Sequence, residues 1–221
     1  MKIKILYEDS NILAIDKPSG ILVHPDQRST EKTILDLFLK KYPKLEIVHR
    51  LDKDTSGVML LAKNKKTHEF LKNQFVNREI KKNYRALVSG FVKNDHGVIN
   101  KPIGRSPRDF RRYLSGRGVR GEVREAITEY KVLKRFLDRK EKFTYLEIRP
   151  KTGRTHQIRV HMKYLNHPIV CDSLYNPDGA CPKGISRMAL HAKSIEFKNL
   201  KGQTIKVESS LPKEFKKLVN P

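Results

Sequence analysis

The stretch HRLDKDTSG, residues 49–57, places acidic, basic and hydroxyl side chains directly before the apolar run VMLLAKN. Because the apolar run predicts a buried strand, the sheet would hold the chain that enters it in a fixed position. Thr55, Ser56 and Gly57 can turn the backbone tightly and donate hydrogen bonds to a carboxylate. A carboxylate with such support stays ionised. The stretch therefore predicts a fixed aspartate that serves as a nucleophile or a base.

A second group of polar residues lies far along the chain, in RPKTGRTHQIRVHM, residues 149–162. Its glycine ends a predicted strand, and Thr155 can cap a following helix that carries Arg159. An arginine held inside a core needs an acidic partner. Three acids are candidates for that partner: Asp52, which is the most attractive, Asp54 and Asp172.

The elements that would position these residues follow from periodicity and turn residues. Helices are expected in residues 29–43, capped by Ser29 or Thr30 and ended by Pro43, and in residues 65–77, 156–165 and 213–220. Strands are expected on both sides of a turn at 8–11, in 58–64, 82–92, 126–136 and 143–150, and in a hairpin of 189–200 with 203–210. Strands and helices do not alternate regularly. This pattern indicates an α+β fold, a single domain with a central, largely antiparallel mixed sheet flanked by helices and loops.

Charge is the strongest compositional signal. Lysine and arginine number 47 against 24 aspartates and glutamates, which gives a net charge of +23. Such a chain favours polyanionic partners, nucleic acid first and an anionic membrane surface second. No apolar stretch reaches the roughly 18 residues that a membrane span requires, and the first apolar run is too short for a signal peptide. We therefore expect a cytoplasmic protein without membrane insertion.

The two cysteines, Cys171 and Cys181, are expected as unpaired thiols in a reducing compartment. A zinc site would need more ligands, and the spacing to His167 and His191 matches no known finger pattern. The sequence thus predicts no metal site.

Residues 104–124, called the basic arm below, contain seven arginines and four glycines with little apolar periodicity. One interpretation is a solvated surface loop. The other is a segment that binds phosphates and becomes ordered on binding. The net charge of the chain favours the second interpretation. The candidate RNA contacts in this segment are Arg105, Arg108, Arg111 and Arg112.

Six motifs together resemble those of the RluA-type pseudouridine synthases. They are DKPSGILVHPD (16–26), HRLDKDTSG (49–57), KNYRALVSG (82–90), PIGRSPRD (102–109), TGRTHQIRVHM (152–162) and RMALHAKSIEF (187–197). The motifs occur in the order typical of that family and cover almost the whole chain. The resemblance implies the pseudouridine synthase fold and the isomerisation of a chosen uridine in RNA to pseudouridine, with no metal or other cofactor.

The resemblance also implies residue roles. Asp52 looks like the catalytic aspartate, acting on the sugar, on the base, or as the acceptor of a sugar proton; a carboxylate suits all three roles. Tyr84 resembles the tyrosine that stacks on uracil, and Arg159 the basic residue that pairs with the catalytic aspartate. Arg50 resembles the residue that fills the gap left by a flipped nucleotide. Further candidates for RNA contact are His49, Thr55, Arg154 and His156.

The chain departs from the family pattern at Asp16, where relatives often carry asparagine, and at Cys171, where they often carry glycine. Because the first motif begins at residue 16, we expect one catalytic domain over residues 1–221, with the basic arm inserted and no accessory RNA-binding domain before it. Two alternatives are a non-catalytic RNA-binding or ribosome-assembly protein and an enzyme that releases a base. We expect a monomer. The RNA, ribosomal or transfer, and the target uridine stay open.

Overall fold

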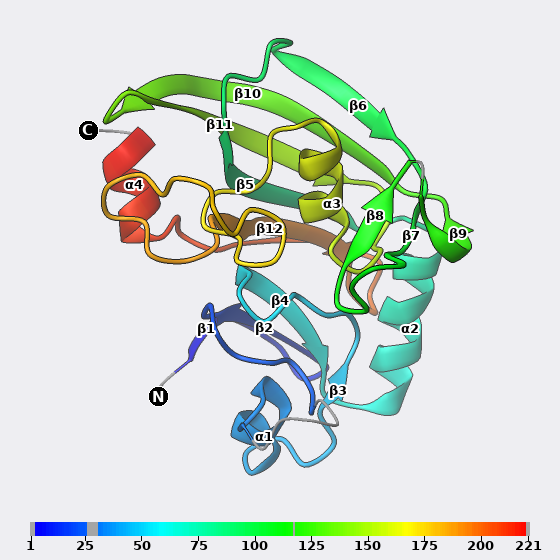
Figure 1. Ribbon diagram of the computed structural model, residues 1–221. Coiled ribbons are helices and arrows are strands. Elements are labelled where there is room, and N and C mark those ends of the chain that lie inside the picture. The colour runs from blue at the N-terminus through cyan, green and yellow to red at the C-terminus, as the bar shows by residue number, and fades with distance from the viewer. Residues whose placement is uncertain (1–2, 26–30, 117, 220–221) are drawn as a thin grey trace. The chain divides into compact units, whose positions relative to one another are not determined.

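The computed structural model describes residues 3–25, 31–116 and 118–219, which form two compact units (Figure 1). Unit 1 comprises Met1–Lys82 and His191–Ser210, and unit 2 comprises Asn83–Leu190 and Leu211–Pro221. Each unit therefore joins segments that are distant in the sequence. That the two units act as one catalytic domain stays a prediction.

Unit 1 is built on a sheet with the strand order β1, β2, β4, β12, in which β3 also pairs with β4 and β13 with β12. Its elements are β1 (Lys4–Glu8), β2 (Ile12–Lys17), α1 (Ile34–Leu39), β3 (Glu46–Ile47), β4 (Ser56–Ala62), α2 (Lys65–Val76), β12 (Leu190–Lys198) and β13 (Thr204–Glu208). Only the pairing of β4 with β12 is parallel among the strand pairs described in this unit.

Strand β4 lies in the centre of the unit 1 sheet, and all of its residues are buried. This burial matches its uninterrupted apolar sequence, because a strand covered on both faces has no polar side to alternate with. Val58 and Leu60 pack in one core cluster with Leu71 of α2 and Ile195 of β12. The strand expected in residues 58–64 is confirmed, although it begins two residues earlier and ends at Ala62.

Helix α1 is shorter than predicted and is capped at a different residue. Thr33 is its N-cap and forms a capping box with Asp36, whose backbone N–H donates to the Thr33 hydroxyl while Asp36 accepts from the Thr33 N–H. The expected caps Ser29 and Thr30 lie outside the described residues. The helix ends at Leu39, before the expected stop at Pro43.

Unit 2 contains an antiparallel sheet with the order β5, β11, β10, β6 and a smaller antiparallel sheet with the order β8, β7, β9. Its elements are β5 (Lys81–Ser89), whose first two residues belong to unit 1, β6 (His96–Asn100), β7 (Ile103–Arg105), β8 (Tyr113–Ser115), β9 (Arg120–Arg124), β10 (Ile127–Asp138), β11 (Glu141–Pro150), α3 (Gln157–Tyr164) and α4 (Lys213–Val219). The predicted α+β class with a largely antiparallel, mixed sheet is confirmed.

Helix α3, which carries Arg159, is tied to β10 by side chains that are buried in unit 2. His161 contacts the Thr128 hydroxyl through Nδ1 at 2.8 Å and the Lys101 carbonyl through Nε2 at 3.0 Å. Burial lowers the pKa of His161 below its usual value, so it is neutral at physiological pH. The helix begins at Gln157, and its N-cap is His156, which has a left-handed backbone (φ 55°) and no side-chain cap bond; the expected cap Thr155 was wrong.

The basic arm is not the irregular segment that its composition suggested. Strands β7, β8 and β9 place part of it in the smaller sheet of unit 2. Ile103 of β7 is buried with Ala126, Val160 and Tyr175 in a separate core cluster. Tyr113 of the arm packs against this cluster, so a small apolar core formed largely by residues outside the arm attaches the arm to the unit.

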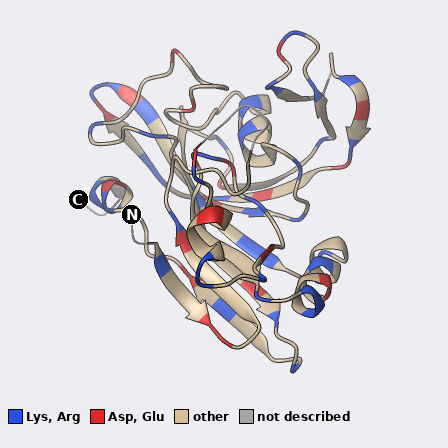
Figure 2. Cartoon of the chain, turned by 90° about the horizontal axis from the view of Figure 1, so that it is seen from below, with Lys and Arg blue, Asp and Glu red and all other residues tan. Residues whose placement is uncertain are grey.

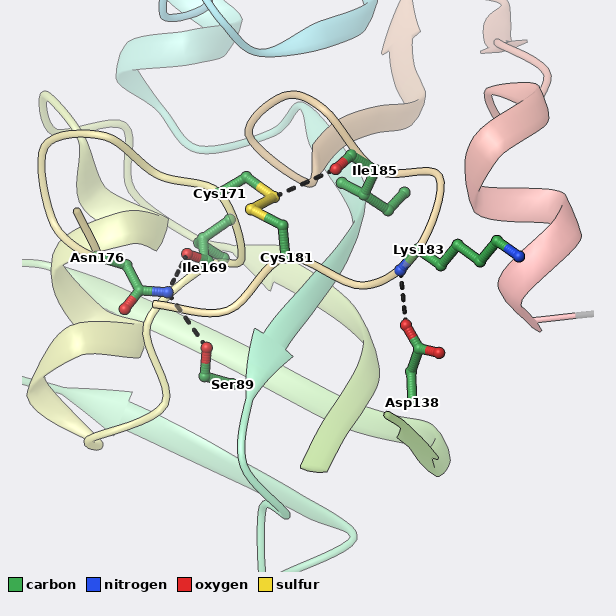
Figure 3. The surroundings of a disulfide bond; sticks show 8 residues. All are labelled: Ser89, Asp138, Ile169, Cys171, Asn176, Cys181, Lys183 and Ile185. Carbon is green, nitrogen blue, oxygen red and sulfur yellow. Dashed lines mark hydrogen bonds between the residues drawn. A yellow bond between two sulfur atoms is a disulfide. The ribbon is translucent and has the colours of Figure 1, made fainter. Parts of the chain in front are cut away.

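The expectation of two unpaired thiols was wrong, because Cys171 and Cys181 form a disulfide (Figure 3). Their Cα atoms lie 5.5 Å apart, and the bond closes a loop of unit 2 that contains Asp172 and Tyr175. Asn176 in the same loop donates to the Ser89 hydroxyl and the Ile169 carbonyl. The loop is thus fixed to the sheet at its base.

The described ranges contain neither a helix that could cross a membrane nor a cluster of metal-ligating side chains. No helix in these ranges is long and apolar enough to cross a membrane. No group of three or more His, Cys, Asp or Glu side chains within the same ranges is arranged to hold a metal ion.

Candidate functional site

The loop that carries Asp52 precedes β4 in unit 1 and is held by the DKPSG segment. Lys17 is completely buried, and its Nζ donates to the carbonyl oxygens of Pro18 at 3.0 Å, Lys53 at 2.8 Å and Thr55 at 2.9 Å. An ammonium inside a core is stable only when such acceptors replace its water shell. Lys17 therefore fixes the backbone on the C-terminal side of Asp52.

Two more hydrogen bonds join the same segments. The Ser19 hydroxyl donates to the Asp54 carbonyl at 2.7 Å, and the Gly20 N–H donates to the Lys53 carbonyl at 2.9 Å. The Thr55 N–H donates to the Asp52 carbonyl at 3.1 Å and closes a turn directly at the candidate aspartate. The half-buried Asp52 side chain is thus attached to a backbone that has few remaining degrees of freedom.

Gly57 shows why this loop must end in a glycine. Its φ is +112°, and a Cβ added at this position would lie 2.2 Å from the Ala192 carbonyl oxygen of β12. Next to it, the buried Ser56 hydroxyl contacts Nδ1 of His191 at 2.9 Å. The close approach of β4 to β12 therefore depends on the last two residues of the motif.

His49 takes part in the support of β4. Its Nε2 accepts a hydrogen bond from the Leu60 N–H at 3.0 Å, and its ring lies 4.8 Å from the Phe75 ring. Burial and the nearby Lys82 ammonium lower the pKa of His49 to about 3. A ring that accepts at Nε2 must carry its proton on Nδ1, which agrees with a neutral imidazole. These contacts are structural, and the expected RNA contact of His49 stays a prediction.

The two other candidates in this loop differ in exposure. Arg50 is exposed, and its Nη1 lies 3.3 Å from Nε2 of His24. Thr55 is 2% exposed and contributes its carbonyl to the Lys17 contact. Arg50 therefore keeps the access that an RNA contact requires, whereas Thr55 is part of the support.

In unit 2, Arg159 is held by Asp172, one of the three acids that the sequence left open. Nε donates to Oδ2 at 2.7 Å and Nη2 to Oδ1 at 2.8 Å, with both side chains buried. Oδ1 also accepts from the backbone N–H groups of Leu174 and Tyr175. The guanidinium lies 4.9 Å from the centroid of the Tyr175 ring. The planar guanidinium is hydrogen-bonded along one edge and covered on one face, so it is held in one orientation.

His156 and Tyr113 extend this cluster. The Tyr175 hydroxyl lies 3.0 Å from Nδ1 of His156 and accepts a hydrogen bond from the Tyr113 backbone N–H at 2.9 Å. The rings of Tyr113 and Tyr175 both meet the His156 ring edge to face. The cluster thereby connects Arg159 to strand β8 of the basic arm. Sequence reasoning missed Tyr175, and no local pattern around it would have revealed it.

Tyr84 lies on β5, opposite Ile148 of β11, and packs partly buried against the main core of unit 2. A ring in this position is rigid, as a stacking partner should be. Asp52 lies in unit 1, whereas Tyr84 and Arg159 lie in unit 2. The pairing of Asp52 with Arg159 therefore stays a prediction.

The four arginines of the basic arm that were predicted to contact RNA fall into two groups. Arg111 donates from Nε and Nη2 to the Asp109 carboxylate at 3.1 and 2.9 Å, and Arg112 lies 3.5 Å from the same group. These partners lower the pKa of Asp109 to about 2. Arg105 and Arg108 are exposed and line a cavity together with Arg154, whose Nε donates to the Glu125 carbonyl. The predicted RNA-contact residues of the basic arm thus differ in environment: Arg111 and Arg112 pair with Asp109, whereas Arg105 and Arg108 line the cavity.

Positive charge is not confined to the basic arm. Figure 2 shows lysine and arginine along helices, strands and loops of both units, in line with the net charge of +23. An α+β chain with this charge and a supported aspartate loop has the properties of an RNA-modifying enzyme.

Comparison with known proteins gives the family. Residues 11–164 match the family described as RNA pseudouridylate synthase. A ribosomal large subunit pseudouridine synthase D from Xanthomonas campestris is 38% identical over 99% of this chain and 69% of its own length. An uncharacterized RNA pseudouridine synthase from Bacillus subtilis, YlyB, is 37% identical over 99% of this chain and 72% of its own length. Among solved structures, human RNA pseudouridylate synthase domain containing 1 superimposes with a TM-score of 0.82 at 26% identity, covering 96% of this chain and 84% of the human chain.

The chain belongs to the RluA-type family of RNA pseudouridine synthases. It is accordingly an isomerase with RNA as its substrate. The resemblance that the six motifs indicated is confirmed.

Proposed function

We propose that this enzyme converts chosen uridines of ribosomal or transfer RNA to pseudouridine, with Asp52 as the catalytic carboxylate. The observation that carries the proposal is the support of the Asp52 loop by Lys17, Ser19 and Gly20. A carboxylate on a fixed backbone is preorganised for the electron-poor sugar that forms when the glycosidic bond breaks. Relatives named ribosomal large subunit pseudouridine synthase D make large-subunit RNA the first substrate to assay.

The reaction balances without a cofactor. The bond from the sugar to the uracil nitrogen breaks, and a bond from the same sugar carbon to a ring carbon forms. That ring carbon loses its hydrogen as a proton, and the freed nitrogen takes up a proton. The mass of the RNA is unchanged, in contrast to the alternative in which the base is released.

Three side chains would assist Asp52. Tyr84 stacks on the uracil while it turns, because a flat ring permits rotation in its own plane. Arg50, which is exposed, occupies the gap left by the extruded nucleotide. Arg159 pairs with Asp52, and its bidentate contact with Asp172 supports this role by fixing the direction of the guanidinium.

The test compares Asp52→Asn with Asp54→Asn, a matched change two positions along the same loop. RNA labelled with tritium at the uracil carbon that bonds to the sugar releases the label only when isomerisation occurs. We expect Asp52→Asn to release none and to bind RNA within about tenfold of wild type, roughly 1.4 kcal/mol. Asp54→Asn should retain release.

Other outcomes would contradict the proposal. Release by Asp52→Asn at the wild-type rate would remove Asp52 from the mechanism. An RNA product that has lost the mass of uracil would support the base-releasing enzyme. Wild-type protein that binds RNA without releasing label from any substrate would favour the RNA-binding or assembly protein.

A further inference from the structure

A cavity of about 570 Å³ lies in unit 2, between the small sheet of the basic arm and the segment before α3. Its volume is within the range of pockets that hold small organic groups. The side chains that give it chemical character are two aromatic rings and five arginines: Phe110, Tyr113, Arg105, Arg108, Arg120, Arg124 and Arg154.

We propose that this cavity binds a second, unpaired nucleotide of the RNA substrate, distinct from the uridine that is isomerised. The base would stack on the aromatic rings, and the neighbouring phosphates would meet the arginines. The proposal rests on the proposed function in that it takes the same RNA as ligand. It adds a recognition site that selects RNA with an unstacked base.

The Tyr113 side of the cavity is held by several contacts. The Tyr113 backbone is fixed by the Tyr175 hydroxyl, and its ring packs against His156. The Arg105 guanidinium lies 5.5 Å from the Tyr113 ring centroid, which is the geometry of a cation over an aromatic face. Proteins that read single-stranded RNA present such fixed rings and guanidinium planes to splayed-out bases. A base entering here would find a surface that needs little ordering.

Phe110 adds an exposed apolar surface. It is 65% exposed although it lies in the most arginine-rich segment of the chain. Large apolar side chains on a charged surface are typical of binding sites. Because Gly104, which also lines the cavity, would place a Cβ 2.2 Å from Cγ1 of Val119, the sheet beneath the cavity is tightly packed.

The charges of the cavity suit a nucleotide within a strand better than a free polyphosphate. Arg120 is exposed, and Arg154 is oriented by the Glu125 carbonyl. Glu122, however, also lines the cavity and pairs with Arg124. A carboxylate repels a cluster of phosphates but accepts hydrogen bonds from the N–H groups of a base edge. The combination favours one base with its flanking phosphates.

The test is fluorescence anisotropy of the full chain with a labelled RNA, either as a single strand or paired in a stable blunt duplex of the same sequence. Phe110→Ala should weaken binding of the single strand about tenfold and leave duplex binding unchanged, since stacking requires an open base. Leu137→Ala is the matched control, because Leu137 is 62% exposed in unit 2 and lies outside the cavity. It should bind both RNAs as wild type does.

A second pair of variants tests the phosphate contacts. Arg120→Gln should weaken binding of the single strand and reduce the slope of log affinity against log salt by about one. Arg139→Gln removes the same charge from an exposed position in the turn between β10 and β11 and should leave the affinity for the single strand closer to the wild-type value. Equal losses for the two variants would overturn the phosphate assignment.

The position of the nucleotide is tested by crosslinking. A single-stranded RNA containing bromouridine is irradiated while bound to the protein. It should crosslink to a peptide that includes Phe110 or Tyr113. Attachment only elsewhere, or equal loss of single-strand and duplex binding in Phe110→Ala, would overturn the proposal. Failure of the proposed function is separate: in that case Asp52→Asn still releases tritium, whatever the cavity binds.

Discussion

Unit 2 contains two arginine–aspartate pairs with the same hydrogen-bond pattern and opposite environments. In both, Nε and Nη2 of the arginine donate to the two carboxylate oxygens. The side chains of Arg159 and Asp172 are 8% and 0% exposed, whereas those of Arg111 and Asp109 are 64% and 20% exposed. Water can therefore compete for the hydrogen bonds of the Arg111–Asp109 pair but not for those of the Arg159–Asp172 pair. The comparison teaches that burial, rather than geometry, decides what such a pair contributes.

The functional consequence follows the same division. The buried pair holds one guanidinium in one direction, which is the requirement for positioning a catalytic group. In the exposed pair, Asp109 offsets part of the positive charge of the basic arm at Arg111 and Arg112. The same hydrogen-bond pattern therefore fixes a side chain where it is buried and forms a surface ion pair where it is exposed.

The largest expected effect is that of Asp172→Asn. The change leaves the Arg159 charge buried without its anion, which costs about 3 to 5 kcal/mol of unfolding free energy. Urea denaturation followed by circular dichroism measures the loss. Asp172→Asn combined with Arg159→Met should recover part of it, because the uncompensated charge is then absent. If Asp172→Asn alone were as stable as wild type, burial would not decide what the pair contributes to stability.

A smaller effect is expected from His49, which extends the rule of burial to a titratable group in unit 1. Its folded pKa, about 3, lies below its unfolded value, about 6.5. The unfolded chain therefore binds the proton first as the pH falls. The stabilisation is fully present above about pH 6.5 and declines by about 1.4 kcal/mol per pH unit below it.

The measurement is the urea midpoint of wild type and His49→Gln between about pH 7 and pH 5, a range above the titration of most carboxylates. We expect wild type to lose about 2 kcal/mol that the variant does not lose. Parallel losses in both proteins would show that His49 does not titrate in this way.

The smallest effect on stability is expected for Asp109→Asn. Because the Asp109 pair with Arg111 is open to solvent, the unfolding midpoint should not change measurably. RNA affinity should rise, since Arg111 and Arg112 become available and the net charge increases by one. Anisotropy at several salt concentrations measures both the affinity and a steeper salt dependence. A decrease in affinity would mean that Asp109 orients the arginines for RNA instead of neutralising them.

Local sequence predicted the elements well where one signal dominated. The apolar run of β4, the amphipathic pattern of α2 and the turn between β12 and β13 all appear where expected. Prediction failed where partners are distant. The three strands of the basic arm pair with one another through residues whose charges conceal any strand pattern. The cap of α1 shifted to Thr33 because Asp36 completes a capping box there.

Among the site residues, the sequence by itself determined the motifs, the family they resemble and the excess of positive charge, because these depend on residue type and spacing alone. The tertiary structure decided that Lys17 donates hydrogen bonds to the Asp52 loop, that Asp172 pairs with Arg159, and that Cys171 forms a disulfide with Cys181. The physical reason is that burial and pairing depend on which distant segments pack together. A lysine at the end of an apolar strand and an aspartate after a cysteine give no local sign of the partners that they find.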